Sequence, residues 1–98
     1  MARIELAAEL AEDFDRILEH LAVHEVDDPH ARVREIINAI DVLEKNPYIG
    51  RPLADDLREL VIGRRSHGYL ALYRYISEID TVFVLALRSQ REAGYTRA

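Results

Sequence analysis

The sequence predicts a two-layer α+β fold, in which two helices cover one face of an antiparallel sheet. Segments 69–76 and 81–88 have the length and composition of buried strands, and the short polar turn 77–80 joins them. Two segments with apolar residues at helical spacing come earlier in the chain. Hydrophobic residues make up 49% of the 98 residues, which predicts a single globular domain spanning residues 1–98.

The first half of the chain predicts a strand and a helical hairpin. Residues 3–7 alternate polar and apolar side chains, as a half-buried strand does. Apolar residues in 8–23 recur at three- and four-residue spacing, which predicts a helix. Asp28 can cap a second helix and Pro29 suits its first position, so this helix is expected from there to just before Pro47.

The second half predicts a meander of three strands. A connector rich in turn residues, 46–52, precedes a further strand candidate at 57–62. A loop with glycine at both ends, 63–68, leads to the two long strands. Because short loops join all three strands, neighbouring strands should be antiparallel. The expected order is an N-terminal strand, the α-helical hairpin and then a three-stranded antiparallel meander, in a two-layer sandwich.

Composition excludes several classes of protein. The net charge is −5, whereas a protein that grips nucleic acid over its whole surface is expected to be basic. The acidic residues concentrate before residue 57, and the later part carries an excess of arginine, whose planar fork of donors pairs with phosphate or carboxylate. There is no cysteine, no apolar run long enough for a membrane helix and no signal peptide at the N-terminus. These features predict a cytoplasmic protein without a membrane partner.

Enzyme signatures are absent from the sequence. His20 and His24 have a spacing that can bind a metal, but no HExxH pattern surrounds them and no third ligand is evident. Solvated histidines at a helix end are the favoured interpretation. No nucleophile elbow or glycine-rich phosphate loop occurs. We therefore expect neither a cofactor nor a metal ion.

Arginines and tyrosines of the last two strands form the most distinctive pattern. By strand alternation, Arg74 shares a face with the other even-numbered residues of 69–76, and Arg88 shares a face with those of 81–88. An arginine among apolar neighbours lies at the rim of a sheet or pairs with an acidic helix residue; for Arg88, which ends its strand, the rim is favoured. Three tyrosines line the opposite face of the first long strand, where a packing ladder is favoured over a base-stacking platform. They are Tyr69, Tyr73 and Tyr75.

Taken together, the runs 46–51, 57–60, 69–74 and 82–88 resemble the RelE/ParE toxin superfamily. The shared pattern is Pro-x-x-Gly, then Leu-Arg, then Tyr-Arg, followed by a strand that ends in a charged tail. The resemblance covers nearly the whole chain, including the order of its elements. It implies a toxin of a bacterial type II toxin–antitoxin system, neutralised by a cognate antitoxin in a hetero-oligomer.

The superfamily has two activities, and the resemblance implies different site residues for each. RelE-like members cut messenger RNA on the ribosome, and ParE-like members poison DNA gyrase. For a ribonuclease, the positions that correspond to catalytic residues are Arg58, Arg65, Arg74, Arg88 and Tyr95. The strand expected at 57–62 has no lysine, the tail has no histidine and the chain is acidic, so the ParE-like branch is favoured. Only the RelE-like alternative would be an enzyme; a non-toxic protein-interaction module is the third alternative.

Overall fold

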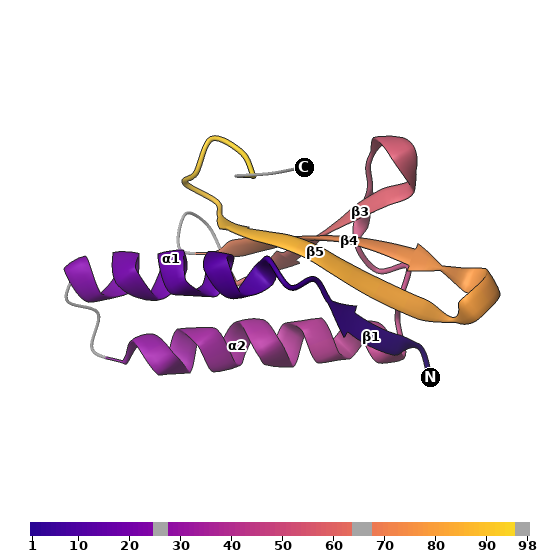
Figure 1. The fold of residues 1–98 in the computed structure, drawn as a ribbon, viewed down its shortest axis with the longest axis horizontal. Coiled ribbons are helices and arrows are strands. Elements are labelled where there is room, and N and C mark those ends of the chain that lie inside the picture. Colours follow the sequence, from indigo (N-terminus) through magenta and orange to yellow (C-terminus); the bar gives the residue numbers. More distant parts are fainter. Residues whose placement is uncertain (25–27, 64–67, 96–98) are drawn as a thin grey trace.

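A computed structural model describes residues 1–24, 28–63 and 68–95. It consists of a five-stranded sheet with two helices packed on one face (Figure 1). The strand order is β1-β5-β4-β3-β2. The predicted two-layer α+β sandwich is confirmed.

The boundaries of the helices and strands agree closely with the sequence pattern. The elements are β1 (Arg3–Leu6), α1 (Leu10–Val23), α2 (Pro29–Asp41), β2 (Arg51–Pro52), β3 (Leu57–Ile62), β4 (Tyr69–Ile76) and β5 (Thr81–Ser89). Strands β3, β4 and β5 form the predicted antiparallel meander, and β1 pairs with β5 in parallel. The helix α2 ends earlier than expected, because a 3-10 turn over Val42–Glu44 tightens its end.

Strand β2 was not predicted. Two residues are too few to show any periodicity, and one of them, Pro52, lacks a backbone donor. The pairing of Arg51 with Glu59 and of Pro52 with Arg58 places β2 at the edge of the sheet, where proline is tolerated. This edge strand brings Arg51 beside the β3 side chains.

The start of α2 confirms the predicted capping. The Asp28 side chain accepts a hydrogen bond from the Ala31 amide at 3.1 Å, and Pro29 occupies the first turn. The cap satisfies one of the amides that a helix start leaves without an intrahelical partner.

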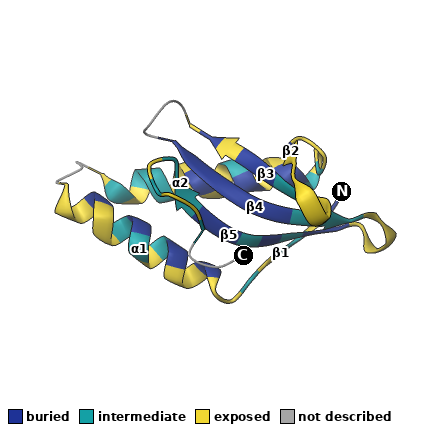
Figure 2. Cartoon of the chain, turned by 90° about the horizontal axis from the view of Figure 1, so that it is seen from above, coloured by how far each residue is buried: buried dark blue, intermediate teal, exposed yellow. Residues whose placement is uncertain are grey.

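The hydrophobic core lies between the helices and the sheet. Figure 2 shows the buried residues running along the centres of β3, β4 and β5. Ile36 of α2 and Tyr73 of β4 are fully buried there. Tyr69 and Tyr73 belong to this core and Tyr75 packs against it, so the packing interpretation of the tyrosine ladder holds.

A β-bulge in β5 corrects the predicted face of Arg88. Leu72 pairs with Ala86 but Tyr73 pairs with Val84, so Leu85 is an extra residue in β5. Val82 and Val84 therefore face the helices, as does Leu87. Arg88 lies on the other side, with Ala86. The alternation rule was wrong for Arg88 because it assumes an uninterrupted ladder.

Candidate functional site on the open face of the sheet

The side of the sheet opposite the helices, here called the open face, carries the candidate site. The C-terminal tail rises from the end of β5 on this side (Figure 1). A groove of about 340 Å³ lies farther along the sheet, with Arg74 in its wall. Its other lining residues are Ala7, Glu9, Leu57, Leu72, Leu85 and Ala86.

Four side chains from three strands and the tail meet on the open face. Glu59 of β3 is 6% exposed, and its carboxylate accepts hydrogen bonds from Arg51 and from the Tyr95 hydroxyl, the latter at 2.7 Å. The Arg88 guanidinium carbon lies 5.2 Å from the centre of the Tyr95 ring, within the range of a cation–π contact. The contacts run from Arg51 to Glu59, from Glu59 to the Tyr95 hydroxyl, and from the Tyr95 ring to Arg88.

The contacts in this cluster determine the protonation states of Glu59 and Tyr95. Burial raises the pKa of Glu59, but the hydrogen bonds from Tyr95 and Arg51 outweigh it, and the pKa lies below the ordinary value. Burial and the bond to Glu59 raise the pKa of Tyr95 well above the ordinary value, although the charge of Arg88 opposes the shift. At neutral pH, Glu59 is therefore a carboxylate and Tyr95 a neutral phenol that donates to it.

The Arg88 guanidinium has one unsatisfied nitrogen. Its Nη1 donates to the Glu92 carbonyl oxygen at 2.7 Å, which fixes the turn of the tail. Its Nε is buried and has no hydrogen-bond partner among the described residues. A buried donor left unpaired costs about 1–3 kcal/mol of folding free energy. The other contacts of Arg88, with the Glu92 carbonyl and the Tyr95 ring, keep the side chain in place despite this cost.

The tail is anchored to α1 by a chain of ion pairs. Arg16 Nε donates to Glu92 at 2.7 Å, and Arg16 Nη1 donates to Asp13 at 2.8 Å. Asp13 is fully buried and also accepts the Leu87 amide of β5 at 3.0 Å. One helix thus fixes both the last strand and the tail that follows it.

The other arginines of the predicted set lie elsewhere. Arg58 donates to the carbonyl oxygens of Tyr48 and Gly50, at 3.0 and 2.9 Å, and so supports the connector before β2. Arg74 donates to the Asp55 carbonyl at 3.0 Å and pairs across the sheet with Phe83, away from the row of Arg88. Arg65 lies outside the described residues.

The structure therefore brings Arg88 and Tyr95 together and keeps Arg58 and Arg74 apart from them. Sequence reasoning missed Arg51 and Glu59. The one available signal was an acidic residue in the middle of a predicted strand, which needs a partner if it is buried. The identity of that partner depends on the β2–β3 register, which two residues of strand do not reveal.

The family to which the chain belongs follows from a comparison of its sequence with protein families. Residues 4–94 match the model of the ParE toxin of type II toxin–antitoxin system, parDE. The chain belongs to the ParE toxin family. The match begins inside β1 and ends at the tail residue before Tyr95, so it includes both helices and all of the sheet except the first residue of β1.

Two solved structures share the fold of this toxin. One is a chromosomal ParDE toxin–antitoxin system from P. aeruginosa, with a TM-score of 0.71 and 22% identity over 91% of this chain and 96% of that one. The other is the archaeal RelE–RelB complex from Pyrococcus horikoshii OT3, with a TM-score of 0.61 and 16% identity over 94% and 98%. No curated protein matches the chain significantly.

Two further features bear on the possible sites of this toxin. Within the three described ranges, no helix combines the length and apolar character that a membrane span requires. No three His, Asp or Glu side chains of those ranges are grouped so that they could hold a metal ion.

Proposed function

We propose that this toxin inhibits growth through DNA gyrase and that a cognate antitoxin encoded beside it neutralises it in the cytoplasm. Membership of the ParE toxin family carries the proposal. A gyrase inhibitor needs a complementary surface and no acid–base group of its own. The open face offers such a surface, with arginines on a rigid sheet and the groove beside Arg74.

The state of Tyr95 supports the same choice. A general base must accept a proton near neutral pH. The Tyr95 hydroxyl instead donates to Glu59, and its raised pKa keeps it protonated. Arg58 and Arg74 are engaged by backbone carbonyls away from the tail, so they do not surround a single phosphate position.

Supercoiling by purified gyrase tests the target. The toxin should block supercoiling and leave cleaved DNA bound to gyrase, and addition of the neighbouring gene product should reverse both effects. In cells, expression of the toxin alone should arrest growth with induction of the DNA-damage response. Well-expressed toxin that neither arrests growth nor inhibits gyrase would support a non-toxic interaction module.

A ribosome-dependent ribonuclease is the second candidate, and the contact of Arg88 with Tyr95 favours it. In this proposal Arg88 stabilises the charge on the phosphorane and Tyr95 is the acid for the leaving oxygen. Arg58, Arg65 and Arg74 complete the proposed set. Codon-level cleavage of messenger RNA on translating ribosomes, without DNA damage, would decide for this candidate.

A further inference from the structure

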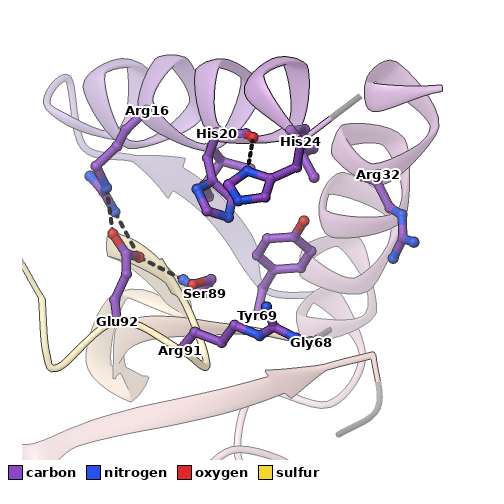
Figure 3. A pocket seen from close by; sticks show the side chains of 11 residues that line it. Arg16, His20, His24, Arg32, Gly68, Tyr69, Ser89, Arg91 and Glu92 are labelled. Atoms are coloured by element: carbon purple, nitrogen blue, oxygen red, sulfur yellow. Dashed lines mark hydrogen bonds and ion pairs between the residues drawn. The ribbon is translucent and has the colours of Figure 1, made fainter. Parts of the chain in front are cut away.

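A second cavity lies away from the open face, where α1, the start of α2 and the ends of β4 and β5 meet (Figure 3). Its volume is about 590 Å³, within the range of sites that hold small molecules. Arg58, Arg74, Arg88 and Tyr95 do not line it. Three of its described lining residues are arginines: Arg16, Arg32 and Arg91.

Among the described residues that line this cavity, arginines outnumber carboxylates. Glu92 is the only acidic residue of that described lining, and Arg16 and the Ser89 amide already occupy its two oxygens. Arg32 of α2 also lines the cavity, is partly buried and makes no hydrogen bond or ion pair within the described parts of the chain. Its side chain is therefore available to an anion in the cavity.

Tyr69 places an unpaired hydroxyl against the same space. The residue is only 6% exposed, yet its hydroxyl has no hydrogen-bond partner within the described ranges. Figure 3 shows the ring directed from β4 towards the gap between the two helices, with His24 and Arg32 around it. Burial raises the pKa of Tyr69, so the hydroxyl is a donor at neutral pH. The hydroxyl can therefore donate a hydrogen bond to a ligand atom in the cavity.

Flat and apolar groups form the remaining wall. The rings of His20 and His24 are in contact, with centroids 4.2 Å apart and planes tilted by 38°, and Ile17 and Leu21 are buried beside them. His24 Nδ1 lies 2.9 Å from the His20 carbonyl oxygen, which can only accept, so Nδ1 carries a proton. This bond fixes the orientation of the His24 ring. Imidazole rings beside aliphatic side chains suit a planar, partly apolar group.

We propose that this cavity binds a nucleoside monophosphate, with its phosphate on Arg32 and the Tyr69 hydroxyl and its base along the His20–His24 wall. The arginine fork and the phenol supply donors that match phosphate oxygens. The volume of the cavity exceeds that of a lone phosphate, and the base can pack against the apolar wall. The proposal is independent of the target of the toxin.

Calorimetric titration of the full chain with AMP tests the proposal, with adenosine and inorganic phosphate as part-ligands at the same ionic strength. AMP should bind saturably with one site per chain and more tightly than either part-ligand. Arg32→Ala should weaken AMP binding about tenfold or more, because a charged hydrogen bond is lost. Tyr69→Phe should weaken it about three- to tenfold while the ring keeps its packing.

Arg34→Ala is the matched control, because Arg34 lies on the same helix, is exposed and does not line the cavity. It should leave AMP binding unchanged. Three results would overturn the proposal: no saturable binding at millimolar AMP, inorganic phosphate binding as tightly as AMP, or Arg34→Ala weakening binding as much as Arg32→Ala. Circular dichroism of each variant separates lost binding from lost folding.

Discussion

Asp13 is a fully buried charge that joins α1 to the last strand. It accepts from Arg16 and from the Leu87 amide, so its loss removes one partner of Arg16 and leaves a backbone donor of the last strand without its acceptor. We expect Asp13→Ala to lower the free energy of unfolding by about 3 kcal/mol or more, measured by urea denaturation. Asp15→Ala, at an exposed position of the same helix, should change it by no more than about 0.5 kcal/mol.

Tyr73 makes a second test at the residue scale. Its hydroxyl accepts the Gly50 amide and donates to the Pro47 carbonyl, both at 2.8 Å, and the side chain is fully buried. Tyr73→Phe should therefore cost about 1–3 kcal/mol of unfolding free energy, since both backbone groups lose their partner. Tyr48→Phe is the control, because Tyr48 is 59% exposed and donates no hydroxyl hydrogen bond within the described ranges. Equal effects of the two changes would contradict this role.

At the scale of elements, the tail should respond to acid through Glu92. Burial raises the pKa of Glu92, but the bonds from Arg16 and the Ser89 amide outweigh it, so the folded pKa lies below the ordinary value. The carboxylate therefore stabilises the docked tail above about pH 4.5, and this contribution is lost as the pH falls through the lower folded pKa. We expect the Ser89 amide resonance to shift in that acidic range in NMR spectra. Glu92→Gln should remove the transition; a transition that persists unchanged would exclude Glu92 as its source.

The elements also show which features a sequence can predict. The Asp28 cap, the proline after it and the apolar strands depend on residues close together in the chain, and these predictions were right. The bulge at Leu85 depends on how β5 pairs with β4, and the Arg51–Glu59 contact depends on the pairing of β2 with β3. Neither register is visible from one strand alone. The arginines were therefore placed on the correct strands, while their distribution over the faces of the sheet required the structure.

At the scale of the whole molecule, the helices cover one side of the sheet and the candidate target surface lies on the opposite side. The tail connects the two layers, because Glu92 pairs with Arg16 of α1 while Tyr95 reaches Glu59 on the open face. A change in the tail thus tests whether the open face catalyses cleavage of RNA or only provides a surface that binds gyrase. The two candidate functions predict different results for the same variants.

Tyr95→Phe separates the two candidates. Phenylalanine keeps the ring beside Arg88 but cannot transfer a proton. If the toxin acts on gyrase, growth arrest and inhibition of supercoiling should be nearly unchanged. If it cuts messenger RNA, cleavage should fall about 100-fold or more, the effect of losing a general acid.

Deletion from Arg91 onward keeps β5 intact and removes the contacts of Glu92 with Arg16 and of Tyr95 with Glu59. It therefore also tests whether the tail contacts the target. Full toxicity after that deletion, at equal protein levels, would exclude a functional role for the tail under either candidate.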